Sequence, residues 1–174
     1  MGTSPPSAER VILVGMMGAG KTSIGQRLAN RLGWRYLDSD EQVERNTGRT
    51  VPEIFETDGE AAFRREEARA LAEATAGAEP SVVSAAGGSV LDAGNRELMR
   101  RAGPVVWLRA EPATLAARVG SGAGRPLLAP DPAAALPRLD AERRPLYAEV
   151  ADVVVDVDDL TPDEVVDRIL SELP

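Results

Sequence analysis

Cysteine and histidine are both absent from this chain of 174 residues. Without cysteine, the protein has no disulfide, no thiol nucleophile and no thiolate metal site. Without histidine, a general base has to be a carboxylate or, more rarely, a lysine or a tyrosine. A metal site would therefore use oxygen ligands, which are the ligands that magnesium prefers.

Long apolar runs and an excess of positive charge are also lacking. No run reaches the length of a membrane span, and the N-terminal segment MGTSPPSAER has no apolar signal-peptide core. We therefore expect a flexible lead over residues 1–10 and a cytoplasmic protein. The net charge of −8 argues against broad binding to nucleic acid or to anionic membranes. The small size favours a monomer.

Short apolar segments alternate with helical segments along the chain. Strands are predicted over 11–14, 34–38, 81–85, 104–108 and 152–157. Helices are predicted over 21–32, 50–59, 60–76, 95–101, 112–119, 133–144 and 162–173. The alternation indicates a single α/β domain over 1–174, with a five-stranded parallel sheet flanked by helices on both faces. Ligands of such sheets bind at the carboxyl ends of the strands.

The stretch GMMGAGKTS lies between the first predicted strand and the first predicted helix. It fits the pattern G-x-x-x-x-G-K-[ST], in which backbone N–H groups and the helix dipole hold phosphates. Lys21 would reach the outer phosphates, and the Thr22 hydroxyl can ligate magnesium. The flanking strand and helix disfavour a glycine-rich turn without a ligand, and no N-K-x-D guanine signature is present, so we expect ATP. The expected nucleotide contacts are Gly18, Ala19, Gly20, Lys21, Thr22 and Ser23.

Two aspartates, Asp38 and Asp40, come directly after the second predicted strand. Because alternate side chains of an extended segment point the same way, both carboxylates can face the site. One can hold the magnesium shell, and the other can orient and deprotonate an acceptor hydroxyl. The alternative is that Asp40 only caps the next helix.

Three arginines fall at the predicted ligand side of the sheet, namely Arg64, Arg125 and Arg143. A guanidinium binds carboxylate or phosphate in a bidentate way, so the three predict an acceptor with a carboxylate. For any one of them alone, the interpretation as a solvated surface arginine is favoured. Arg125 lies in residues 120–132, where glycine and proline predict a mobile loop. Gly87 and Gly88 allow the backbone to approach a ligand closely.

Taken together, these stretches resemble shikimate kinases from Val11 to about Leu173. The resemblance is carried by GMMGAGKTS, DSD, EIFETDGEAAFRREE, AGGSV, RPLL and ERRPLY. It implies a P-loop kinase fold with a substrate-binding helical region near 39–76 and a lid near 120–132. It also implies transfer of the ATP γ-phosphate to the 3-hydroxyl of shikimate, with one magnesium ion.

The resemblance also implies roles for single residues. Lys21 and Thr22 are similar to the family's phosphate and magnesium residues, and Asp38 to its magnesium-shell carboxylate. Asp40 is similar to the catalytic base, and Arg125 to the lid arginine beside the transferring phosphate. The residues that look like the acceptor pocket are Arg64, Arg143, Gly87, Gly88, Glu67, Phe55 and Phe63. Those that look like the pair around adenine are Arg118 and Pro162.

The family pattern leaves two points open. It usually shows three glycines where this chain has Ala86, Gly87 and Gly88, and a methyl group restricts φ and adds bulk. The R-x-P-L-Y spacing selects Arg143 rather than its neighbour Arg144. Three rival interpretations remain: another small-molecule kinase such as a gluconate or nucleoside-monophosphate kinase, a catalytically silent nucleotide-binding module, and a switch GTPase.

Overall fold

The computed structural model describes residues 9–129 and 131–174. The expected flexible lead over 1–10 therefore falls mostly outside the described residues. Its last residue, Arg10, already opens strand β1 (Arg10–Val14). Within the described chain, no helix combines the length and the apolarity that crossing a bilayer requires.

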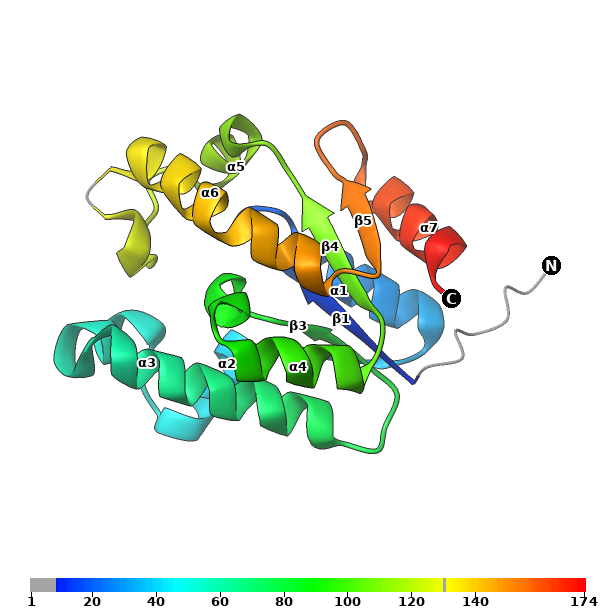
Figure 1. Cartoon of the computed structure of the whole chain (residues 1–174), viewed down its shortest axis with the longest axis horizontal. Coiled ribbons are helices and arrows are strands. Elements are labelled where there is room, and N and C mark those ends of the chain that lie inside the picture. Colours follow the sequence, from blue (N-terminus) through cyan, green and yellow to red (C-terminus); the bar gives the residue numbers. More distant parts are fainter. Residues whose placement is uncertain (1–8, 130) are drawn as a thin grey trace.

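Five parallel strands form the sheet, as predicted. Besides β1 they are β2 (Arg35–Asp38), β3 (Ser81–Ser84), β4 (Val105–Arg109) and β5 (Val153–Asp156). Their order in the sheet is β2-β3-β1-β4-β5. The central strand β1 pairs in parallel with both β3 and β4, so its apolar residues are wholly buried (Figure 1).

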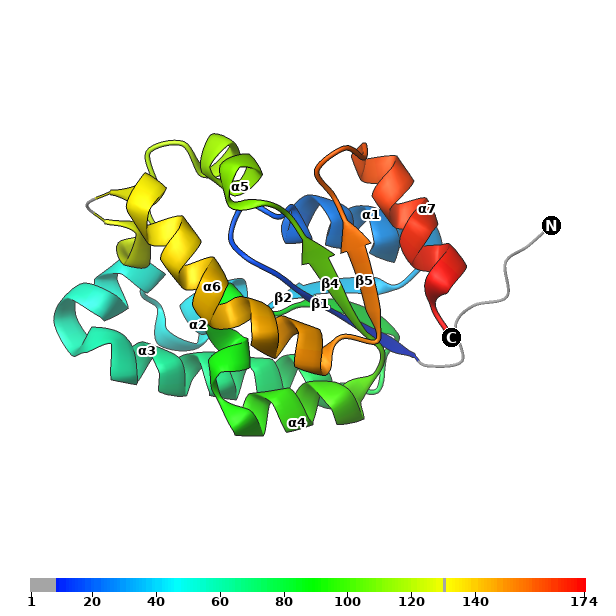
Figure 2. The ribbon, with the colours of Figure 1, turned by 45° about the horizontal axis from the view of Figure 1, so that its top comes forward.

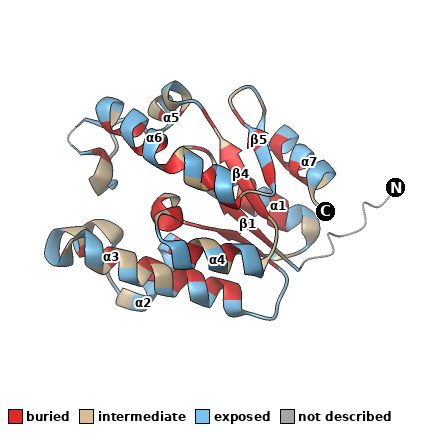
Figure 3. Ribbon diagram, in the orientation of Figure 1, coloured by how far each residue is buried: buried red, intermediate tan, exposed pale blue. Residues whose placement is uncertain are grey.

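Helices cover both faces of this sheet. One face is covered by α1 (Lys21–Leu32) and α7 (Pro162–Glu172), which pack against each other. The other face is covered by α4 (Ala93–Ala102) and α6 (Pro132–Val150), as Figure 2 shows. The buried residues gather between these layers (Figure 3), and they are mainly valine and leucine from the strands together with the inner sides of the helices.

The remaining elements are α2 (Ser39–Thr47), α3 (Val51–Ala76), α5 (Pro112–Val119) and two short 3-10 helices, η1 (Gly87–Leu91) and η2 (Pro126–Leu128). Most of them lie around the carboxyl ends of the strands, whereas the second half of α3 runs back alongside α4 toward the start of β3 (Figure 1). Helix α2 was not among the individually predicted helices, although it falls inside the helical region expected near 39–76.

The largest differences from the predicted helix boundaries are in α3 and α6. The helices predicted over 50–59 and 60–76 form one element, α3, which is broken where Gly59 adopts φ 85° and ψ 173°. Helix α6 does not end at Arg144 but continues through Pro145 to Val150. The missing N–H of Pro145 costs one helical hydrogen bond, but burial of Tyr147 and Val150 in the core compensates for it.

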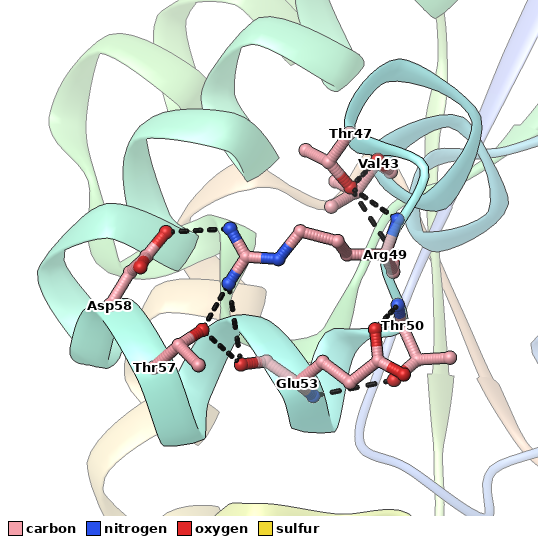
Figure 4. A network of polar contacts seen from close by, with 7 residues as sticks. All are labelled: Val43, Thr47, Arg49, Thr50, Glu53, Thr57 and Asp58. Atoms are coloured by element: carbon pink, nitrogen blue, oxygen red, sulfur yellow. Dashed lines mark hydrogen bonds and ion pairs between the residues drawn. The ribbon is translucent and has the colours of Figure 1, made fainter.

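The corner between α2 and α3 is held by polar contacts around Arg49 (Figure 4). Its guanidinium donates to Asp58 Oδ2 at 2.8 Å and also to Thr57 Oγ1. Thr50 and Glu53 form a capping box at the start of α3. These contacts fix the first part of α3, before the break at Gly59, against the end of α2.

Candidate active site

A cavity of about 580 Å³ opens at the carboxyl ends of the strands. Its wall combines the loop after β1, the start of α2, α3 as far as Glu67, the turn after β3, one residue of α5, the 120–132 loop and one residue of α6. The predicted site residues in this wall are Gly18, Gly20, Lys21, Thr22, Ser23, Asp38, Asp40, Phe55, Phe63, Arg64, Glu67, Gly87, Gly88, Arg118, Arg125 and Arg143.

The loop after β1 has the backbone that a phosphate cradle requires. Gly15, Gly18 and Gly20 all have positive φ, and a Cβ on Gly15 would lie 2.7 Å from the carbonyl oxygen of Leu108. Lys21 Nζ donates to the carbonyl oxygens of Gly15 at 2.6 Å and Met16 at 3.1 Å. Burial lowers the pKa of Lys21 to about 8, although the charges of Asp40 and Asp38 oppose this shift. The amine is therefore still mostly protonated at neutral pH.

Of the two residues expected around adenine, Arg118 lines the cavity and Pro162 does not. Arg118 lies in the cavity wall, and its Nη1 donates to the carbonyl oxygens of Gly18 at 3.2 Å and Ala19 at 3.4 Å. Ala19, in the same loop, is buried and is not among the wall residues that the structure describes. Pro162 occupies the first turn of α7 and is not among the described residues of the cavity wall.

Asp38, not Asp40, caps helix α2. Asp38 Oδ1 accepts from the backbone N–H groups of Asp40 at 2.8 Å and Glu41 at 3.2 Å. The alternative that Asp40 only caps this helix is therefore wrong, and its carboxylate remains available to the cavity. Although Asp40 keeps contact with solvent through the cavity mouth, desolvation and then the charge of Asp38 raise its pKa to about 6.

The acceptor side is built from guanidinium groups and glycines. Arg143 is buried with 1% of its surface exposed, and its Nε has no hydrogen-bond partner among the described residues. Arg64 Nη1 donates to both carboxylate oxygens of Glu67, at 2.9 and 3.0 Å. Burial raises the pKa of the Glu67 carboxyl, and the charge of Arg64 opposes this.

The glycine pair after β3 makes room for these arginines. A Cβ on Gly88 would lie 2.1 Å from Arg64 Nη1, and one on Gly87 would lie 3.3 Å from Arg143 Nη1. The two glycines were predicted to let the backbone approach a ligand. In the structure they let the backbone approach the side chains of Arg64 and Arg143. Tyr147 completes this side, because its hydroxyl donates to the Gly87 carbonyl oxygen at 2.6 Å.

Arg143 and Arg144 point in different directions. Arg144 leaves the cavity, donates from Nε to Asp140 Oδ2 at 3.1 Å and lies over the ring of Trp107. Arg143 lines the cavity. The R-x-P-L-Y spacing selected Arg143, and Arg143 is the one of the two that the structure places at the site.

The backbone at Ala86 is compatible with any residue. Its φ of −55° and ψ of 145° lie in an ordinary region, so the methyl group causes no strain. Its N–H donates to the Oγ of the buried Ser39 at 2.9 Å. The turn itself therefore does not require a glycine at this position.

The 120–132 loop extends over the cavity. Gly120, Gly122 and Gly124 have positive φ, and η2 follows them. Arg125 lies in the cavity wall but is exposed, whereas Leu128 is buried and anchors the loop. Pro130, within this loop, lies outside the described residues.

Residue-by-residue reasoning missed Ser39, Glu44 and Tyr36 as parts of the site. Glu44 lies in the cavity wall, and its Oε1 accepts from the backbone N–H of Val51 at 3.3 Å. Ser39 ties the start of α2 to the turn after β3. The alternation of side chains along β2 could have indicated Tyr36, because it lies two residues before Asp38 on the same strand.

The donor set near Thr22 and Asp38 suits magnesium. Among the described residues there is no group of three or more acidic, histidine or cysteine side chains that could hold a metal by itself. Magnesium usually binds through one or two protein oxygens, with water and substrate phosphates filling the remaining positions. A threonine hydroxyl and a carboxylate beside a phosphate cradle fit that mode.

Comparisons with known proteins agree with this geometry. The sequence model of the family described as "Shikimate kinase" matches residues 17–174. A shikimate kinase of Symbiobacterium thermophilum is 48% identical over 166 residues, with 94% of this chain and 95% of that protein covered. A shikimate kinase of Ruegeria pomeroyi is 44% identical over 164 residues, with 94% of this chain and 84% of that protein covered.

Solved structures extend the comparison. A shikimate kinase from Acinetobacter baumannii, solved in complex with shikimate, has a TM-score of 0.91 at 38% identity, covering 95% of this chain and 93% of that one. A gluconokinase from Sinorhizobium meliloti has a TM-score of 0.59 at 22% identity, covering 97% of this chain and 92% of that one, a likeness that shows the P-loop kinase fold alone. The family match over most of the chain and the high identities together establish that this chain belongs to the shikimate kinase family.

Proposed function

We propose that this protein transfers the γ-phosphate of ATP to the 3-hydroxyl of shikimate, giving shikimate 3-phosphate and ADP. The observation that carries the proposal for the acceptor is the buried guanidinium of Arg143. A buried charge is costly unless an anion accompanies it, yet Arg143 makes no ion pair among the described residues, whereas Arg64 pairs with Glu67. The carboxylate of shikimate would supply that anion.

Asp40 would act as the general base in this reaction. It accepts the proton of the acceptor hydroxyl while the oxygen attacks the γ-phosphorus, and the bond from phosphorus to the ADP oxygen breaks. A pKa of about 6 suits this role, because the carboxylate is ionised at neutral pH and still basic enough to take a proton.

Charge on the transferring group would be neutralised from two sides. Lys21 reaches it from the phosphate loop and Arg125 from the 120–132 loop, which we propose closes as a lid over the cavity and excludes water. Thr22 and Asp38 would hold magnesium, which when bound lowers the charge of the phosphates. The expected contact of Pro162 with adenine would require the nucleotide to extend beyond the described cavity wall.

The cellular setting is also a proposal. We propose that the protein works as a monomer in the cytoplasm, with small-molecule substrates and no nucleic-acid or membrane partner. The net charge of −8 and a surface with almost no exposed large apolar side chain in the described chain support this.

The first experiment is a coupled assay of ADP release with magnesium-ATP, with and without shikimate. Strong dependence on shikimate would support the proposal. ADP release that ignores shikimate but responds to gluconate or to a nucleoside monophosphate would contradict it. If none of the tested acceptors stimulates ADP release, only the prediction of nucleotide binding would remain.

Arg143→Lys and Arg144→Lys form a matched pair for the acceptor pocket. Lysine keeps the charge but loses the bidentate fork, so Arg143→Lys should raise the KM for shikimate about tenfold or more. Arg144 contacts Asp140 and Trp107 outside the cavity, so Arg144→Lys should change this KM by less than about twofold. Equal effects of the two variants would refute the assignment of the carboxylate to Arg143.

A further inference from the structure

An unusual glycine in helix α1 makes room for the ring of Tyr36. Gly25 is buried in the middle of the helix, where glycine destabilises a helix by about 1 kcal/mol relative to alanine. A Cβ on Gly25 would lie 2.5 Å from Tyr36 Cε2 and 3.1 Å from Cδ2. The ring of Tyr36 is therefore held between strand β2 and helix α1.

The packing of the ring brings the hydroxyl of Tyr36 to the magnesium end of the cavity. The hydroxyl donates to Asp38 Oδ2 at 3.2 Å, within the same strand. Ser84 on β3 lies near this hydroxyl, and its own Oγ donates to the carbonyl oxygen of Lys21 at the start of α1, at 3.2 Å. The phenol thus lies where the second strand, the third strand and the start of α1 meet.

Both oxygens of Asp38 are then engaged by the protein. Oδ1 caps helix α2 through the N–H groups of Asp40 and Glu41, and Oδ2 accepts from Tyr36. A carboxylate with hydrogen bonds at both oxygens has one orientation, and ligand orientation set by outer hydrogen bonds governs metal affinity.

We propose that Tyr36 is a positioning residue for the magnesium site, which acts by fixing the carboxylate of Asp38 and does not itself touch substrate. The inference rests on the proposed function, because it assigns Asp38 and Thr22 to magnesium. Neither a phosphate-loop pattern nor the paired aspartates require a tyrosine at this position.

The test measures binding of Mn²⁺, a paramagnetic ion with similar oxygen coordination, to the protein with ADP by electron paramagnetic resonance. Tyr36→Phe keeps the ring that packs on Gly25 and removes only the hydroxyl. We expect about tenfold weaker Mn²⁺ binding, with the KM for shikimate changed by less than about twofold and Tm within a few degrees of the parent.

Tyr147→Phe is the matched control, since Tyr36 and Tyr147 are the two tyrosines of the chain. The hydroxyl of Tyr147 contacts the Gly87 carbonyl on the acceptor side. Its removal should therefore raise the KM for shikimate and leave Mn²⁺ binding within about twofold of the parent. Equal loss of Mn²⁺ affinity in both variants would overturn the proposal, because a general loosening of the cavity would explain it.

A second readout needs neither metal nor activity. If Tyr36 acts through Asp38, Tyr36→Phe should speed hydrogen exchange at the amides of Asp40 and Glu41 in the nucleotide-free protein. Unchanged Mn²⁺ affinity, or weaker affinity with unchanged exchange at these amides, would overturn the proposal while leaving shikimate kinase activity in the parent intact. Failure of the parent to bind Mn²⁺ with ADP would overturn the magnesium assignment itself.

Discussion

The phosphate loop and the acceptor pocket share one cavity but are built in different ways. The loop is shaped by its backbone, with positive φ at Gly15, Gly18 and Gly20 and a single charged side chain, Lys21. The acceptor pocket is shaped by charged side chains from separate elements, with Arg64 on α3 and Arg143 on α6. Under the proposed roles, the phosphates are held mainly by backbone groups, whereas the acceptor acid is held by guanidinium groups arranged around its shape.

The largest expected effect is at Asp40, which lies between the two regions. Asp40→Asn removes the base but keeps the shape of the side chain, so kcat should fall about a thousandfold while ATP binding persists. Because burial raises the pKa of Asp40, the ionised form destabilises the folded protein above about pH 6, and Tm at pH 7.5 should rise. Steady-state kinetics and thermal unfolding measure both. Parent-like turnover would exclude Asp40 as the base.

A smaller loss is expected at Arg125, in the part of the 120–132 loop that lines the cavity. Arg125→Ala should lower kcat about a hundredfold, because one charge that stabilises the transferring group is removed. Nucleotide affinity, measured by isothermal titration calorimetry, should remain close to that of the parent. Near-normal turnover would refute the assignment of Arg125 to the lid.

The pH profile separates the two regions without any substitution. kcat/KM should fall as pH drops through about 6, because Asp40 gains a proton, and fall again above about 8, because Lys21 loses one. Burial is the largest cause of both pKa shifts, and Lys21 and Asp40 also act on each other. The other charged groups that contribute are Asp38, Glu44, Arg125 and Arg143. In Asp40→Asn the acid limb should disappear from the residual activity, and its persistence would assign that limb to another group.

The smallest effect is expected at Ala86, where the two regions meet. Since its φ of −55° suits alanine, Ala86→Gly should leave both KM values within about twofold of the parent. The added freedom of the unfolded chain should lower the free energy of unfolding by about 0.4–1 kcal/mol, measurable by urea denaturation. A large gain in ATP affinity would show that the methyl group obstructs the nucleotide.

Sequence reasoning reached the sheet and the phosphate loop because both depend on consecutive residues. Apolar runs and the GMMGAGKTS spacing are local signals. The observed strands and α1 lie close to the positions that these signals predict. The arrangement of the acceptor pocket depends on contacts between distant segments. That Gly88 accommodates Arg64 follows from packing that no single segment encodes. The cap of α2 is a local contact, but the sequence places two aspartates near the helix start and does not choose Asp38 over Asp40.

The predicted helix boundaries were wrong where tertiary contacts outweighed the local preference of the sequence. Pro145 predicts the end of a helix, yet α6 continues because Tyr147 and Val150 are buried beyond it. Gly59 predicts an end, and the structure has a break there with helix on both sides. The role of Tyr36 depends on Gly25 across the interface between β2 and α1, which a pattern along one strand does not contain.

The depressed pKa of Lys21 has a practical consequence, because Lys21 is the only lysine in the chain. A mild acylating reagent near pH 8 would find a single side-chain amine, about half of it in the nucleophilic form, inside the nucleotide site. Apart from the α-amino group of the chain, such a reagent would attach a spectroscopic label or a crosslinker at one defined position. Protection from labelling by ATP would then report occupancy of the site directly, without any catalytic turnover.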